Sequence, residues 1–332
     1  MLGYIVQRLL IMVPTLIVIS IVVFTIIKLP PGDYFSTYVA ELQSEGEAVD
    51  LQKIEFLKKE YGFDKPVWEQ YLYWAGGLLR GDLGYSFEYN LPVRDIVGDK
   101  LFLTFIVSFA TVLFTYVVAF PIGIYSATHQ YSWSDHALTL LGFIGLATPN
   151  FLLALVLLYL ANIYLGVSIG GLMDPRYLDA PWSLAKAQSV FAHLWIPVIV
   201  IGLSGTAGMI RRLRANLLDE LQKQYVTTAR AKGLPPFRAL VKYPLRMALN
   251  PFISDIGSLL PHIISGAAVV SVVMNLPTTG PMLLEALRSQ DMYLAGSFLM
   301  FLAFLTVIGM LISDLALAAL DPRIRLSGGV SR

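Results

Sequence analysis

Three long stretches without a charged residue limit what this chain can fold into. Residues 9–27, 101–134 and 137–173 contain no Asp, Glu, Lys or Arg. Each is close to or longer than the ~20 residues that a helix needs to cross the hydrocarbon core of a bilayer. With 56% hydrophobic and only 14% charged residues, the chain is also too apolar for a soluble domain. The sequence therefore predicts an all-α, polytopic membrane protein.

Six transmembrane helices are expected. They fall within residues 1–29, 101–134, 137–173, 187–210, 248–274 and 292–320. The first apolar run is longer than the core of a signal peptide and no small-residue cleavage site follows it, so we expect it to be retained. Pro121 and Pro149 lie inside the second and third spans, where proline is expected to kink the helix.

Charge distribution predicts which side of the membrane each loop occupies. Residues 30–100 carry seven basic and thirteen acidic residues, which suits a long extracytoplasmic loop, with short helices expected at Asp50–Tyr61 and around Trp68–Ala75. Apart from that loop and Lys28 at the end of the first span, thirteen Lys and Arg residues fall on the side that holds both termini and three in the short loops on the other. Because basic residues are retained inside, both termini are expected in the cytoplasm, with a membrane core at 101–325 and a tail at 326–332.

The most basic part of the chain lies between the fourth and fifth spans. The segment 211–246, called the basic loop below, holds nine of the 24 Lys and Arg residues against two acids. Leucines at helical spacing predict that the fourth span continues into this loop as an amphipathic helix; they are Leu213, Leu217, Leu218 and Leu221. A second short helix, Tyr225–Lys232, is expected to end at Gly233, since glycine suits the left-handed conformation after a helix.

A third helix is expected to follow that glycine. Pro235 and Pro236 suit the first turn of a helix, where a missing N–H costs nothing. Phe237, Leu240 and Val241 then give this helix one apolar face. The basic loop is therefore predicted to form two short helices at an angle.

Several motifs carry a family resemblance. The segment 227–234, together with Pro244-Leu245-Arg246, resembles the cytoplasmic EAA loop of type I ABC importer permeases. The strings 61–66 and 81–87 resemble the first external loop of dipeptide and oligopeptide permeases, and 320–325 matches their C-terminal signature. The resemblance covers nearly the full length and is to the "B" member of these systems. The chain departs from the family pattern at three positions: Ser271 stands in place of Glu, Leu276 in place of Trp and Thr278 in place of Gly. These departures bear on which substrate the protein carries.

The resemblance implies roles for the residues of the basic loop. In the family, this loop forms a coupling helix that docks on the ATPase subunit. The residues that the resemblance assigns to coupling are Thr227, Thr228, Ala229, Arg230, Ala231, Lys232, Gly233 and Leu234. The acidic residue of the motif is absent, and Thr227 stands in that region. A basic loop adsorbed on anionic lipid headgroups is the alternative interpretation.

Polar residues in the fifth span are candidates for a substrate path. Steps of three, four and three place them on one helix face; they are Asp255, Ser258, His262 and Ser265. Polar groups within a span usually face a cavity or a partner. The same face could instead hold this subunit to a neighbouring one. Asn150, beside the kink expected at Pro149, is a further candidate, although satisfying the carbonyls freed by the proline explains this position as well.

No motif for catalysis is present in the sequence. The phosphate-binding pattern G-x-x-x-x-G-K-[ST] does not occur, so ATP and magnesium would be bound by partner subunits. The four histidines lack metal-ligand spacing, there is no cysteine, and the basic residues lack the interleaved aromatics of a nucleic-acid surface. We expect neither an enzyme active site, a cofactor, a metal nor a nucleic-acid partner.

Together these observations predict a permease subunit of an ATP-driven importer in the bacterial inner membrane. The family resemblance implies a heterodimer with a paralogous permease, two cytoplasmic ATPase subunits and an external solute-binding protein that delivers di- or oligopeptides. Oligosaccharides and nickel chelates are the alternative cargoes. A stand-alone channel or secondary transporter is the alternative class, and no internal repeat typical of such proteins is visible.

Overall fold

The computed structural model describes residues 2–45, 51–165, 170–178, 180–255, 259 and 267–320. The chain forms two compact units. The first comprises Met1–Leu103 and Thr278–Ile308, and the second Thr104–Pro277 and Gly309–Arg332. Two long helices, α5 (Val93–Thr128) and α15 (Met292–Leu320), run from one unit into the other.

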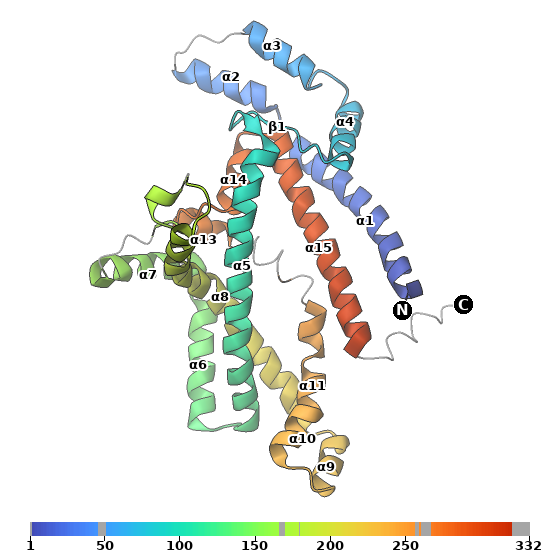
Figure 1. Ribbon diagram of the computed structural model, residues 1–332, viewed down its shortest axis with the longest axis vertical. Coiled ribbons are helices and arrows are strands. Elements are labelled where there is room, and N and C mark those ends of the chain that lie inside the picture. Colours follow the sequence, from blue (N-terminus) through green and yellow to red (C-terminus); the bar gives the residue numbers. More distant parts are fainter. Residues whose placement is uncertain are drawn as a thin grey trace. The chain divides into compact units, whose positions relative to one another are not determined.

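The first unit consists of one apolar helix and a folded loop (Figure 1). Its elements are α1 (Leu2–Lys28), α2 (Tyr34–Glu45), α3 (Leu51–Glu60), α4 (Val67–Leu79), β1 (Tyr85–Ser86), β2 (Leu91–Pro92) and α14 (Thr279–Arg288). The two strands pair in antiparallel fashion, with Ser86 opposite Leu91. Helices α3 and α4 confirm the two helices predicted in this loop, whereas α2 and the strand pair were not predicted.

Aromatic side chains form the core of that loop. The Phe35 ring centroid lies 4.8 Å from that of Phe87 and 5.3 Å from that of Phe63. Asp291, fully buried, fixes the strand pair to the start of α15, because its carboxylate accepts hydrogen bonds from Ser86 Oγ (2.6 Å) and the Leu294 amide (3.1 Å). Burial raises the pKa of Asp291, an effect that these donors oppose.

The second unit contains the remaining helices. They are α6 (Trp133–Ala147), α7 (Asn150–Leu165), the 3-10 turn η1 (Pro175–Tyr177), α8 (Leu184–Leu221), α9 (Gln224–Ala231), α10 (Pro236–Lys242), α11 (Pro244–Ala248) and α13 (Ala268–Val273). Figure 1 shows α9 and α10 beyond the C-terminal end of α8. The expected continuation of the fourth span into the basic loop is confirmed, since α8 is one helix through Leu221.

Four helices of the described chain are long and apolar enough to cross a membrane: α1, α5, α8 and α15. Helices α6 and α7 qualify as a fifth span only as a pair, and they are bent by 100°. The predicted kink at Pro149 is therefore a full break, whereas α5 continues through Pro121. Much of the predicted fifth span lies outside the described residues, at 256–258 and 260–266.

Glycines allow the helices of the second unit to approach closely. A Cβ atom added at Gly123 of α5 would lie 3.1 Å from Leu213 Cδ2 and 3.3 Å from the Ile210 carbonyl oxygen of α8. At Gly202 of α8 it would lie 2.8 Å from the Phe114 ring of α5. Small residues at helix crossings are typical of membrane proteins, where close van der Waals packing holds helices together.

We therefore expect Gly123→Leu to destabilise the second unit by about 1–3 kcal/mol, the usual cost of overpacking. Gly98→Leu, in the same helix, is the matched control because no atom lies within 4 Å of an added Cβ there. Thermal unfolding of the purified protein in detergent measures the difference. Equal midpoints for the two variants would contradict the close approach of α5 and α8.

Candidate functional site

The turn between α9 and α10 has the geometry predicted from Gly233. Gly233 adopts φ +78°, in the left-handed region. Its amide donates to the Arg230 carbonyl (2.9 Å), and the Leu234 amide donates to the Ala229 carbonyl (3.2 Å). These two bonds form a Schellman motif, which satisfies carbonyls at the end of α9. Pro235 then precedes the first turn of α10, as expected.

One side of this turn is buried. Val226 and Ala229 of α9 and Ala239 of α10 are at most 6% exposed. The Tyr225 hydroxyl donates to Glu220, which ties α9 back to the last turn of α8. Burial and this bond to the Glu220 carboxylate raise the pKa of Tyr225 to about 12, so the phenol remains a donor at neutral pH.

The other side of the turn is exposed and combines positive charge with apolar surface. Phe237 is 75% exposed and Val241 47% exposed, and Arg230 and Lys232 at the end of α9 are exposed as well. The apolar face predicted for α10 is therefore divided, because Leu240 packs inward while Phe237 and Val241 do not. We call the exposed side chains of Arg230, Lys232, Phe237 and Val241 the α9–α10 face. An exposed phenylalanine among basic residues is typical of a surface that binds another protein.

A continuous apolar cluster supports this face. Leu213 and Leu217 of α8 have no exposed surface and pack with Ala119 of α5, Ala248 of α11 and Phe252. Leu240 of α10 packs against the same cluster. The basic loop is therefore attached to the ends of α5 and α8 through a close-packed core.

A cavity of ≈350 Å³ lies within the second unit. Its lining includes hydroxyl and amide side chains and one cation: Thr111, Thr115, Tyr116, Asn150, Ser204 and Arg212. The predicted candidate Asn150, the first residue of α7, is thus part of the lining. Polar groups that converge on a mainly apolar cavity are typical of small-molecule sites.

An ion pair lies at this cavity. Arg212 Nη2 is 2.6 Å from Asp255 Oδ2, and the guanidinium lies 4.8 Å from the centre of the Phe252 ring. Ser313 Oγ donates a hydrogen bond to the Ser254 carbonyl oxygen (2.6 Å), and this bond holds the backbone beside Asp255. Both members of the pair remain partly exposed, so they can exchange partners with a charged solute at moderate cost.

Sequence reasoning found only part of this arrangement. Asp255 was a predicted candidate, but its partner Arg212 was not, since helical spacing does not reveal contacts between helices. The other residues predicted on its face, Ser258, His262 and Ser265, lie outside the described residues. Among the residues that the structure describes, no cluster of three or more His, Asp or Glu could hold a metal ion.

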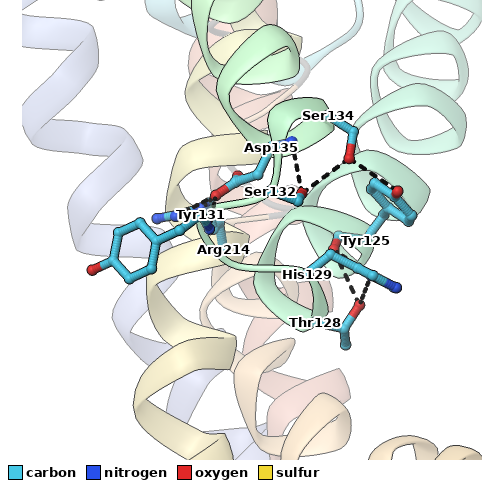
Figure 2. A network of polar contacts seen from close by, with 8 residues as sticks. All are labelled: Tyr125, Thr128, His129, Tyr131, Ser132, Ser134, Asp135 and Arg214. Atoms are coloured by element: carbon cyan, nitrogen blue, oxygen red, sulfur yellow. Dashed lines mark hydrogen bonds and ion pairs between the residues drawn. The ribbon is translucent and has the colours of Figure 1, made fainter.

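A second ion pair is buried and joins α6 to α8. Asp135, 2% exposed, accepts hydrogen bonds from Arg214 Nε (3.0 Å) and Nη2 (2.8 Å) and from the Tyr131 amide (3.1 Å). Figure 2 shows this pair beside the turn that connects α5 to α6, where Ser132 caps α6. The arrangement fixes the start of α6 against α8. No local sequence pattern indicates it, because the partners are 79 residues apart.

The chain is similar to known proteins over its whole length. Residues 119–326 match the family "Binding-protein-dependent transport system inner membrane component", and residues 1–110 match its N-terminal counterpart. Similar proteins include the oligopeptide transport system permease protein AppB of Bacillus subtilis, 32% identical over 98% of this chain and 99% of the relative. The dipeptide transport system permease protein DppB of Escherichia coli is 28% identical, with the same coverage. The glutathione transport system permease protein GsiC of Pectobacterium atrosepticum is 29% identical, again with the same coverage.

Replacing Gly233 tests the geometry of the turn. Gly233→Pro forces φ to about −65° and removes the amide that donates to Arg230, so we expect the α9–α10 turn to open. Gly233→Asn is the matched control because asparagine tolerates the left-handed region. Hydrogen exchange of amides 224–242 measures the effect, and faster exchange is expected for the proline variant alone. Equal protection in both variants would show that the left-handed residue is unimportant.

Proposed function

The chain belongs to the family of inner membrane components of binding-protein-dependent transport systems, and from this premise we propose that it passes peptides through the membrane as one subunit of an importer. It is the permease subunit, and the peptide cargo is supported by the names of its relatives, which are oligopeptide, dipeptide and glutathione permeases. The family model matches more than half of the chain, and the relatives align with nearly all of it.

We propose that the complete importer contains four further subunits. An external solute-binding protein delivers the peptide, a paralogous permease completes the membrane part, and two cytoplasmic ATPases drive the cycle. The absence of a G-x-x-x-x-G-K-[ST] pattern supports nucleotide binding on other chains. The family description supports a location in the bacterial inner membrane, and the excess of Lys and Arg in the basic loop supports cytoplasmic termini.

One observation supports a coupling role for the basic loop. The α9–α10 face is exposed, while the opposite side of the same helices packs on a close-packed apolar cluster. An ATPase subunit that binds Arg230, Lys232 and Phe237 would hold the basic loop at its exposed side. Because the buried side packs through Leu240 against the cluster that contains Leu213 and Leu217, a movement of the ATPase would be passed to α8 rather than absorbed in the loop. The segment 227–234 is then the coupling helix with its glycine turn.

The 350 Å³ cavity is the best candidate for the peptide path. Its threonine, serine and asparagine side chains can exchange hydrogen bonds with peptide groups. Arg212 and Asp255 supply one charge of each sign, which matches the carboxylate and ammonium ends of a short peptide. Transport then consists of a shift between two conformations of this subunit and its partner, driven by ATP and without chemistry on the peptide.

Phe237→Asp should weaken docking of the ATPase. Removing a central aromatic contact from an interface typically costs ~2 kcal/mol or more, so we expect the affinity to fall about 30-fold or further. The readout is binding of purified ATPase subunits to the detergent-solubilised permease complex. Phe56→Asp is the matched control, because Phe56 is 66% exposed on α3 of the long loop. Unchanged ATPase affinity for Phe237→Asp would rule out docking at the α9–α10 face.

Charge reversal tests the ion pair at the cavity. Arg212→Asp and Asp255→Arg each replace the ion pair by two like charges, and we expect peptide uptake by reconstituted vesicles to fall about tenfold or more. The double exchange restores the pair and should recover part of the uptake. ATPase binding is the control and should remain unchanged in all three variants. Full uptake by both single variants would exclude the pair from the transport path.

A further inference from the structure

A second cleft lies on the other side of α8, between this helix and α6. Its volume is ≈250 Å³, and all of its lining comes from α6, α8 and the turn before α6. The two helices run in opposite directions, so the start of α6 lies beside the end of the apolar part of α8 (Figure 1). Nothing in the proposed transport path uses this cleft.

The lining changes from polar to apolar along the two helices. The polar residues at the mouth are Tyr131, Asp135, His136, Arg211 and Arg214, and Thr139 is one further polar residue deeper in the lining. One to two turns deeper, the lining is otherwise apolar or small on both helices: Leu138, Gly142 and Phe143 of α6, and Ala207 and Ile210 of α8. Gly142 faces only Ala207, 3.9 Å from an added Cβ atom, so the deeper part is kept open by small side chains. The cleft therefore has a charged mouth and an apolar floor.

The mouth carries net positive charge. Arg214 is neutralised by the buried Asp135, which it binds through Nε and Nη2. Arg211 forms no ion pair with an acid in the described ranges; its guanidinium lies 5.8 Å from the centre of the Phe143 ring. One exposed guanidinium therefore remains available at the mouth, with Arg214 Nη1 and the His136 ring next to it.

We propose that this cleft binds one anionic phospholipid, with the phosphate at Arg211 and an acyl chain along Phe143 and Leu138. The planar guanidinium is suited to bind two phosphate oxygens at once. Basic pockets between transmembrane helices at the membrane surface commonly bind anionic headgroups. The apolar floor distinguishes a lipid from a free phosphate, because a free phosphate would leave that floor without a partner.

The flanking aromatic residues support a position at the membrane surface. Trp133 is 92% exposed and Tyr131 74% exposed, both at the start of α6. Tryptophan and tyrosine are enriched at the level of the lipid headgroups. Figure 2 shows the Tyr131 ring pointing away from the helices, as expected for a side chain in that layer. The mouth of the cleft is therefore placed at the level of the lipid headgroups.

The test is a titration of the purified, complete transporter with phosphatidylglycerol and, separately, phosphatidylcholine, with bound lipid counted by native mass spectrometry. We expect Arg211→Gln to lower the phosphatidylglycerol affinity about 5- to 10-fold and to leave phosphatidylcholine affinity unchanged. Gly142→Leu fills the apolar floor and should lower retention of both lipids. Arg176→Gln, which removes an exposed arginine elsewhere in the chain, is the matched control and should change neither affinity.

Three results would overturn the proposal. The first is equal phosphatidylglycerol affinity for Arg211→Gln and the control. The second is displacement of the lipid by excess glycerol phosphate, which would indicate a site for a soluble phosphate. The third comes from Leu138→Cys, which introduces the single cysteine of the chain. Cross-linking of this cysteine to the paralogous permease, instead of labelling by a maleimide-bearing lipid, would show that a protein helix fills the cleft.

Discussion

Burial of Leu213 and Leu217 between α8 and its neighbours is the interaction on which the proposed coupling depends. Helix α8 has 38 residues, which at 1.5 Å per residue is about 57 Å, far longer than the ~30 Å hydrocarbon core. Its last turns must therefore leave the bilayer, where an isolated helix end would fray. Two fully buried leucines, each contributing ~1.5–3 kcal/mol, hold this end against α5 and α11 instead. The basic loop thus begins from a fixed support.

Local signals were sufficient to predict the parts of the fold that are defined by short-range geometry. Gly233 and the following prolines predicted where α9 ends and α10 begins, because backbone conformation depends on these residue types almost regardless of context. Hydropathy predicted α15 from Met292 to Leu320, since the thickness of the bilayer sets its length. Neither argument needs knowledge of any distant residue.

Contacts between distant residues could not be predicted in this way. The charge of Asp135 is visible in the sequence, but its partner Arg214 is not, because nothing local indicates that α6 and α8 adjoin. The same holds for Asp255 and Arg212, and for the polar side chains that line the cavity from three helices. Helical periodicity shows which residues share one face of a helix, but not which other element that face contacts. The turn at Gly233 was therefore easier to predict than the lining of the cavity.

The three arginines near the end of α8 show how one helix can serve separate sites. Successive residues of an α-helix are rotated by about 100°, so Arg211 and Arg214 lie within about 60° of each other, and Arg212 points to a different side. Accordingly, Arg211 and Arg214 line the α6 cleft, whereas Arg212 lines the cavity and pairs with Asp255. The charge on Arg214 is neutralised by a buried carboxylate and anchors the helix, whereas Arg212 is paired with the partly exposed Asp255 and Arg211 is paired with no acid in the described ranges. Because all three lie within about one turn of α8, and Leu213 of the supporting cluster lies among them, a rotation of α8 would move the basic loop, the cavity and the cleft together.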